Sequence, residues 1–175
     1  MDIVIVGAGL GGLSAAATLL QQGHRVRVFE QAAQLGEVGA GIQMSANAMK
    51  VLDRLGLRAA LEPLAVRPQA FEFRRHDSGE LLHRLPLGAA HEQRHGAPYF
   101  QIHRSDLHSA LQQAVRALDP QAITLNARVC AVQEHADGAS LHFDALAPVH
   151  ADLVVGADGI KSVVRRHIQI GRAHV

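Results

Sequence analysis

The chain has 175 residues, 48% of them apolar, with 17 lysines and arginines against 16 aspartates and glutamates. This length fits one domain or part of a larger protein, and the apolar fraction is sufficient for a hydrophobic core. The near balance of charges gives no support for a nucleic-acid partner or an anionic membrane surface. The single cysteine, Cys130, excludes a disulfide within the chain, and its apolar surroundings predict a buried structural thiol.

The first apolar run is too short to span a membrane or to act as a signal peptide. No basic segment precedes it. We therefore expect a cytoplasmic protein without membrane contact.

The first thirty residues predict a dinucleotide-binding unit. The apolar run Ile3–Val6 has the length of a buried strand, and Gly7, Gly9 and Gly12 follow in the spacing G-x-G-x-x-G. Gly7 permits a tight turn, Gly9 lets a pyrophosphate approach the backbone, and Gly12 lets the next helix pack closely against the strand. The N-terminus of that helix then offers N–H groups to the phosphates.

Further residues favour this interpretation over a glycine-rich turn without a ligand. Ala16 occupies the next close-packing position of the helix, and Gly23 is placed to end it. A second strand, Val26–Phe29, ends in Glu30, whose carboxylate can accept the hydroxyl groups of an adenosine ribose. The motif alone leaves NAD and FAD open.

Beyond Glu30 the pattern predicts loops, helices and hairpins. The glycine-rich segment Gly36–Gln43 is expected to be a loop near a ligand, and Gly88–Pro98 to be a polar loop. Apolar spacing and turn residues predict the other elements: helices over Asn47–Leu55, Arg58–Glu62 and from Ser105 to Leu118, and strands over Ala70–His76, Glu80–Leu85, Tyr99–His103, Ile123–Leu125, Arg128–Val132, Ser140–Phe143 and Leu153–Val155.

The segment after the last strand repeats the design of the first motif. Gly156-Ala157-Asp158-Gly159 brackets a turn with glycines, and a helix carrying Ser162 and Arg165 follows. Alone, such a segment is often only a capped turn. Together with the opening motif it predicts a second contact with the same dinucleotide.

Four segments in order resemble the FAD-dependent aromatic hydroxylases, single-component flavoprotein monooxygenases, in the branch that contains salicylate hydroxylases and 6-hydroxynicotinate 3-monooxygenase. They are GAGLGG with Glu30, GAGIQMSANAMKVLDRLGL at 39–57, IHRSDLHSAL at 102–111 and GADGIKSVVR at 156–165. The resemblance implies an α/β fold: a Rossmann-like FAD-binding domain of the glutathione-reductase type, with a central parallel sheet, interrupted by the start of a substrate domain.

Members of this family are about twice as long, so the resemblance implies an N-terminal part that is not competent alone. It places an incomplete, discontinuous FAD-binding domain at 1–70 and 98–169 and the first strands of the substrate domain at 71–97. Residues 170–175 equal the translation of a common sequencing-adapter DNA, and we expect them to be a non-native tail.

The resemblance also assigns roles to residues. It implies that Arg104 contacts the flavin dinucleotide, that Val129 meets the adenine through its backbone, and that Asp158 lies near the pyrophosphate. Gln43 stands where nicotinate-type members carry a histidine base; it cannot take a proton, so we expect it beside the flavin and assign no catalytic residue. The expected cofactor-binding residues are Gly7, Gly9, Gly11, Gly12, Glu30, Gln31, Gln43, Arg104, Val129, Asp158 and Gly159.

The implied reaction hydroxylates a small phenolic or carboxylated aromatic substrate, with FAD as cofactor and NAD(P)H and O2 as co-substrates. A homodimer is one assembly that the resemblance allows for the complete protein. The aromatic substrate and the choice between NADH and NADPH stay open.

Two alternatives stay open as well. One is an FAD- or NAD-binding Rossmann oxidoreductase without oxygenase activity. The other is a zinc peptidase, because His91 and His95 fit the spacing H-E-x-x-H. The short segment between Gly88 and Pro98 has no apolar stripe and no further ligand at suitable spacing, which argues against zinc, and no metal is expected.

Overall fold

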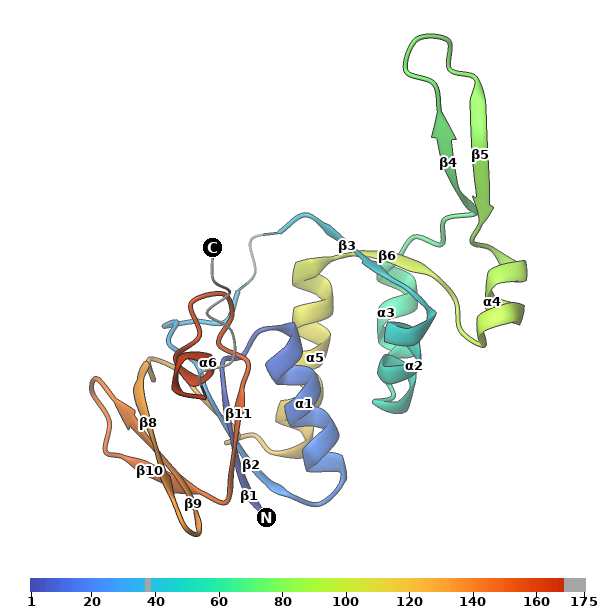
Figure 1. Cartoon of the computed structure of the whole chain (residues 1–175). Coiled ribbons are helices and arrows are strands. Elements are labelled where there is room, and N and C mark those ends of the chain that lie inside the picture. The colour runs from blue at the N-terminus through green and yellow to red at the C-terminus, as the bar shows by residue number, and fades with distance from the viewer. Residues whose placement is uncertain (37–38, 169–175) are drawn as a thin grey trace. The chain divides into compact units, whose positions relative to one another are not determined.

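The computed structural model describes residues 1–36 and 39–168 (Figure 1). The chain forms two compact units, Met1–Gly36 with Leu111–Val175, and Glu37–Ala110. The non-native tail expected at 170–175 lies outside the described residues. The domain division expected from the sequence, with 71–97 set apart, stays a prediction.

The first unit is built on a parallel sheet in the order β11-β1-β2-β7. Its strands are β1 (Asp2–Val6), β2 (Arg25–Phe29), β7 (Ile123–Thr124) and β11 (Leu153–Gly156), and helix α1 (Leu10–Gln21) connects β1 to β2. The predicted α/β fold with a central parallel sheet is therefore confirmed. The pairing of β1 with β11 brings the two glycine motifs to the same end of the sheet, because Val6 lies opposite Gly156.

Both faces of β1 are buried. Helix α1 buries Leu13, Ala16 and Ala17, and strand alternation places Ile3 and Ile5 on the opposite face from Val4 and Val6. The latter two belong to an apolar cluster with residues of an antiparallel sheet, among them Val129, Leu141 and Phe143. A strand that is buried on both faces has a continuous run of apolar residues. This burial explains why the sequence of β1 is apolar without alternation.

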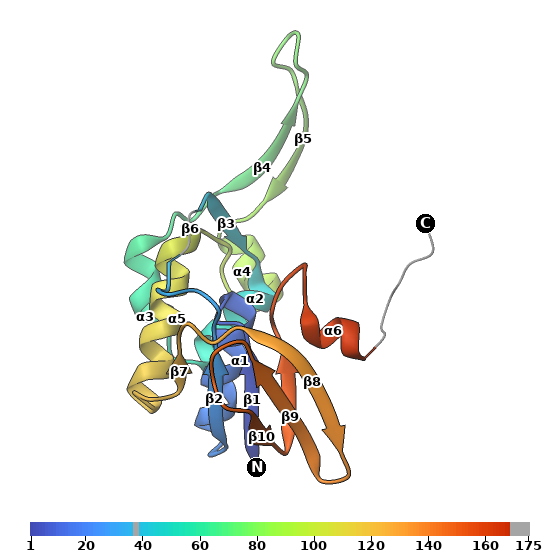
Figure 2. The same ribbon diagram turned by 90° about the vertical axis from the view of Figure 1, so that its left-hand side faces the viewer.

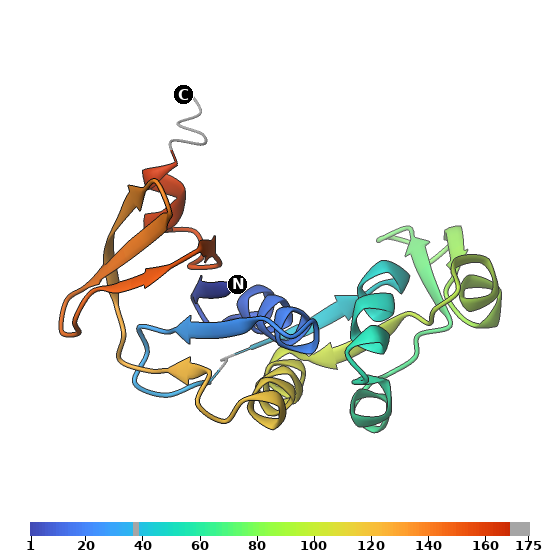
Figure 3. The same ribbon diagram turned by 90° about the horizontal axis from the view of Figure 1, so that it is seen from below.

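The antiparallel sheet has the order β10-β9-β8, with β8 at Val129–His135, β9 at Gly138–Phe143 and β10 at Val149–Ala151. Strand β10 was not predicted. Helix α6 (Val163–His167) lies beside β8, as Figure 3 shows from below.

The prediction of a buried thiol at Cys130 is wrong, because this residue is exposed. The register of β8 against β9 shifts between Val129 and Ala131. Such a bulge interrupts the in-and-out alternation of side chains, so the apolar neighbours of Cys130 do not decide its burial. Its thiol donates to the carbonyl of His142 at 3.3 Å.

The second unit contains a paired β-ribbon that the sequence did not predict. Strand β3 (Gly41–Met44) pairs antiparallel with β6 (Phe100–His103), although Gly36–Gln43 was predicted to be a loop. A glycine-rich segment is a poor strand by local preference, and here a distant partner strand supplies the hydrogen bonds. The helices of this part of the chain are α2 (Ala46–Arg54), α3 (Arg58–Leu61), a 3₁₀ turn (Glu62–Leu64) and α5, which begins at Arg104 and ends at Leu118.

The predicted hairpin is confirmed as β4 (Ala70–Arg74) and β5 (Leu81–Pro86). In Figure 2 it extends away from α2 and α4 as a two-stranded ribbon. Large apolar side chains on it are exposed to solvent, with Phe73 at 58% and Leu82 at 61%.

The predicted polar loop at Gly88–Pro98 is wrong over most of its length, because Ala89–His95 forms helix α4. Gly88 is its N-cap, and Gly96 ends it in the left-handed conformation with φ of +73°. Glycine at this position is a common helix stop, and it outweighs the polar composition of the segment.

Candidate dinucleotide site

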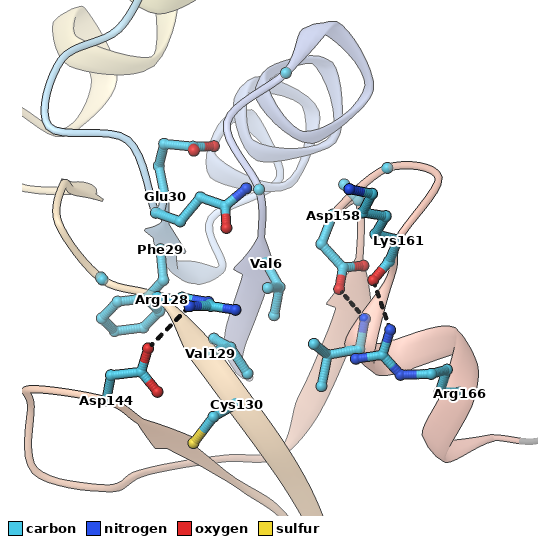
Figure 4. Close-up of a pocket in the computed structure, with 17 residues that line it drawn as sticks. Val6, Phe29, Glu30, Arg128, Val129, Cys130, Asp144, Asp158, Lys161 and Arg166 are labelled. Carbon is cyan, nitrogen blue, oxygen red and sulfur yellow. Dashed lines mark hydrogen bonds and ion pairs between the residues drawn. The ribbon is translucent and has the colours of Figure 1, made fainter.

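A cavity of about 580 Å³ opens in the first unit, at the carboxyl ends of β1, β2 and β11 (Figure 4). Ligands of parallel α/β sheets bind at this end, where the strands give way to loops. Its wall includes the turns after all three strands and the start of β8. The predicted cofactor residues on this wall are Gly7, Gly9, Glu30, Gln31, Val129, Asp158 and Gly159.

The glycines of the first motif have different tasks. Gly7 has φ of +100°, and a Cβ there would lie 2.4 Å from the carbonyl oxygen of Ala157. A Cβ at Gly12 would lie 2.0 Å from the carbonyl oxygen of Gly7. Both positions therefore need glycine for the packing of the protein itself. A Cβ at Gly9 would meet no protein atom within 4 Å, so the packing of the protein does not require a glycine there, and the space on this wall is left for a ligand.

The start of α1 offers donors to an anion. Gly9 is the N-cap and provides no side chain, and no acidic residue lies in the first turn. The first N–H groups of a helix have no acceptor within the helix, and the helix dipole adds partial positive charge there. This combination is suited to a phosphate group.

The Glu30 side chain connects the glycine turn after β1 to the loop after β2. One carboxylate oxygen accepts from the backbone N–H of Ala8 at 2.8 Å, and the other accepts from Ala32 at 2.9 Å. Each carboxylate oxygen has a further lone pair. The side chain is thus held in place and can still accept hydroxyl groups.

The Asp158 side chain accepts hydrogen bonds from the residues that follow it in its own loop. Its carboxylate accepts from the Ser162 hydroxyl and from the backbone N–H groups of Val163, at 2.6 Å, and Val164, at 3.3 Å. The Ser162 hydroxyl in turn accepts from the N–H of Arg165 at 2.9 Å. Asp158 and Ser162 together cap α6, and this cap fixes the loop that forms one wall of the cavity.

Other charged residues line the cavity that the sequence analysis did not select. Arg128 and Asp144 approach each other at 3.6 Å, and Lys161 and Arg166 lie on the side of Asp158 (Figure 4). Arg128 and Asp144 meet through the pairing of β8 with β9, for which no local sequence signal exists. Lys161 lies two residues after the glycine-bracketed turn, and this proximity is a signal that could have identified it.

Gln43 and Arg104 belong to the second unit, and their roles at the cofactor stay predictions. The Gln43 side-chain oxygen accepts from the hydroxyl of Tyr99 at 2.9 Å. Burial raises the pKa of Tyr99, so this phenol stays protonated as a donor. The backbone N–H of Arg104 donates to the carbonyl of Ala40 at 3.4 Å, and a Cβ at Gly39 would lie 3.0 Å from Cβ of Arg104. Gly11 and Gly12 do not line the cavity.

The H-E-x-x-H motif forms one turn of α4, with the rings of His91 and His95 4.5 Å apart. Glu92 forms ion pairs with Arg58 and Arg67. Within residues 1–36 and 39–168, no three histidine, cysteine or acidic side chains are grouped to hold a metal ion. The geometry of this region gives no support to a zinc peptidase.

The sequence model described as FAD binding domain matches residues 1–174. The chain belongs to this family. No helix among the described residues is long and apolar enough to cross a membrane.

Three similar proteins place the chain within the family. It is 46% identical to a 3-amino-4-hydroxybenzoate 2-monooxygenase of Streptomyces cremeus, over 95% of the chain and 41% of that protein. It is 37% identical to a 6-hydroxynicotinate 3-monooxygenase of Pseudomonas fluorescens, over 95% and 42%. A crystal structure of Klebsiella pneumoniae HpxO complexed with FAD and uric acid superposes with a TM-score of 0.82 at 28% identity, covering 95% of this chain and 41% of that one. The chain thus spans about two fifths of the length of these proteins.

The residues present fit the ADP part of FAD. The open space at Gly9 admits a pyrophosphate to the start of α1, and the Glu30 carboxylate lies on the same wall as the first strand of the antiparallel sheet. The cavity therefore offers a phosphate site, a ribose acceptor and an apolar strand in one unit.

Proposed function

We propose that the complete protein is an FAD-dependent monooxygenase that hydroxylates a small aromatic acid with NAD(P)H and O2. The observation that carries this proposal is the cavity that the two glycine motifs share at the carboxyl end of one parallel sheet. Each motif alone has a structural explanation. Their convergence on one cavity, in a member of an FAD-binding family, calls for a dinucleotide.

The residues of the chain bind and orient the cofactor. In this proposal the N–H groups at the start of α1 bind the pyrophosphate, Glu30 accepts the adenosine ribose hydroxyls, and the backbone at Val129 contacts the adenine. Gln43 lies beside the flavin ring as a hydrogen-bonding residue, and Arg104 pairs with the dinucleotide phosphates. A bound flavin supplies the hydride and oxygen chemistry that no side chain can provide.

The substrate class is supported by the relatives. Those named above act, by their names, on an aminohydroxybenzoate and a hydroxynicotinate. Both are aromatic rings that carry a hydroxyl and a carboxylate. We therefore propose a hydroxylated aromatic carboxylic acid as the substrate of the complete protein.

The test uses the complete protein. We expect it to purify with the visible absorbance of a flavin, and we expect 3-amino-4-hydroxybenzoate, 6-hydroxynicotinate, 3-hydroxybenzoate or salicylate to accelerate both NAD(P)H oxidation and oxygen uptake. A colourless protein that does not take up FAD would refute the proposal. A flavoprotein whose NAD(P)H oxidation consumes no oxygen with any aromatic acid would instead be a dehydrogenase.

A further inference from the structure

We propose that Lys161 binds the phosphates of the dinucleotide, as a cation that lines the same cavity as the start of α1. This inference rests on the proposed function, because it names an additional residue of the same cofactor site. Lys161 has no role assigned from the sequence, although the segment GADGIKSVVR contains it.

The charges on the cavity wall differ in what they contact. The Arg128 guanidinium is 3.6 Å from the Asp144 carboxylate. The Arg166 guanidinium donates to the backbone carbonyl of Lys161 at 2.9 Å, and the Asp158 carboxylate is engaged by the N-terminus of α6. Each of these groups already has a partner within the protein.

The ammonium group of Lys161 differs from them. Within the described part of the chain it forms no ion pair and no hydrogen bond, although its residue lines the cavity. Figure 4 shows its side chain beside Asp158, across the cavity from Glu30 and Arg128. The bond from Arg166 to its carbonyl holds the backbone from which this side chain extends.

The phosphates need such a charge. A pyrophosphate diester carries two negative charges, and a helix N-terminus contributes only about half a positive charge. An ammonium group on the same wall supplies a full charge and adds hydrogen-bond donors to the phosphate oxygens. Because the side chain is exposed, the attraction is expected to be moderate and to weaken with salt.

The experiment compares ligands that differ in their phosphates. FAD binding to the complete apoprotein is followed by flavin fluorescence, and ADP and adenosine are used as competitors. At low ionic strength we expect Lys161→Gln to weaken the binding of FAD and of ADP roughly three- to tenfold. The affinity for adenosine should stay unchanged. We expect Lys161→Arg to restore most of the loss, and the difference to shrink at high salt.

The matched control is Lys50→Gln, because Lys50 lies in α2 and does not line the cavity. It should leave all three affinities unchanged. Equal affinity of Lys161→Gln and the parent protein for FAD would overturn the inference while leaving the proposed function intact. An equal loss for ADP and adenosine would also overturn it, because it would show a structural effect of the substitution. Failure of the parent protein to bind either FAD or ADP would overturn the proposed function as well.

Discussion

At the scale of single residues, the three glycines of the opening motif differ in whether the packing of the protein requires them. Gly12 faces the carbonyl of Gly7 so closely that a Cβ has no room. Gly9 faces open space, and its φ of −72° is accessible to any residue. The same residue type in one motif is therefore required by packing at one position and leaves open space in the cavity at the other.

This difference predicts opposite results for two small substitutions. Gly9→Ala should lower the free energy of unfolding by no more than about 1 kcal/mol, the cost of alanine at an N-cap, and should weaken ADP binding at least tenfold, because the methyl group takes the space of the phosphates. Gly12→Ala should lower the free energy of unfolding by several kcal/mol, on the order of an overpacked core. Denaturant unfolding and ADP calorimetry measure the two effects. Unimpaired ADP binding by Gly9→Ala would contradict this assignment.

Glu30 forms two hydrogen bonds within the protein, apart from its proposed role in binding. Glu30→Gln should lower the free energy of unfolding by about 1 to 2 kcal/mol. The carboxylate accepts hydrogen bonds from the N–H groups of Ala8 and Ala32, whereas a carboxamide has one acceptor oxygen and can accept only one of them. Denaturant unfolding measures the loss. Glu80→Gln, at an exposed position in the hairpin turn, is the control and should have no measurable effect. A stable Glu30→Gln variant would show that the two hydrogen bonds contribute little.

At the scale of elements, α6 depends on its cap. With only five residues, Val163–His167 is too short to be stable by itself. Asp158→Ala removes the acceptor for two helix N–H groups, and Ser162→Ala removes the one for Arg165. We expect each to cost about 1 kcal/mol and to accelerate amide hydrogen exchange in residues 160–167.

The exchange pattern is the decisive measurement for this cap. Substitution of Asp137, which is exposed in the β8–β9 turn, should leave exchange in 160–167 unchanged. If Asp158→Ala also left it unchanged, Asp158 would not support α6, and a direct role at the ligand would be its remaining function.

His91 in helix α4 is expected to make the stability of the protein depend on pH. The pKa of His91 is lowered from 6.5, first by burial and then by the charge of His95, and its buried Nε2 atom has no hydrogen-bond partner among the residues that the structure describes. The unfolded chain therefore binds a proton more readily than the folded one. This contribution to stability is complete above pH 6.5 and is lost progressively as the pH falls through 6.5 toward the lowered value.

His91→Phe should remove this dependence. Between pH 7.5 and 5.5 the free energy of unfolding of the parent should decrease relative to that of the variant. His76→Phe, in the exposed hairpin turn, should follow the parent. If the free energies of unfolding of the parent and of His91→Phe changed equally with pH, His91 would not contribute to the acid sensitivity.

At the scale of the whole molecule, the cavity belongs to one unit, so a ligand should stabilise the two units unequally. ADP at one hundred times its dissociation constant adds about 2.7 kcal/mol to the unit that binds it, which corresponds to roughly 10–20 °C in its unfolding midpoint. Hydrogen exchange should slow in residues 1–36 and 111–168 and change little in 39–110 outside the start of α5, where Arg104 is proposed to contact the phosphates. Slower exchange confined to 39–110 would place the ligand elsewhere.

Local sequence patterns predicted most elements but failed where distant partners decide. The apolar run of β1, the glycine turn of α1 and the hairpin at Asp77-Ser78-Gly79 carry their structure in neighbouring residues. Strand β3 exists because β6 pairs with it, and the exposure of Cys130 follows from a bulge between β8 and β9. Helix α4 was missed for a different reason: its flanking glycines act as caps, whereas its composition suggests a loop.

The sequence by itself determined the α/β class and the two glycine motifs, because glycine spacing and apolar runs are local properties, and its resemblance to known proteins implied the FAD-binding family. Only the tertiary structure decided which of these glycines the packing of the protein requires and which one faces open space in the cavity, because that depends on the pairing of β1 with β11, some 150 residues apart in the chain. The same pairing placed Lys161 on the cavity wall. Local spacing encodes the turn, and the packing of distant strands makes it one wall of a cavity.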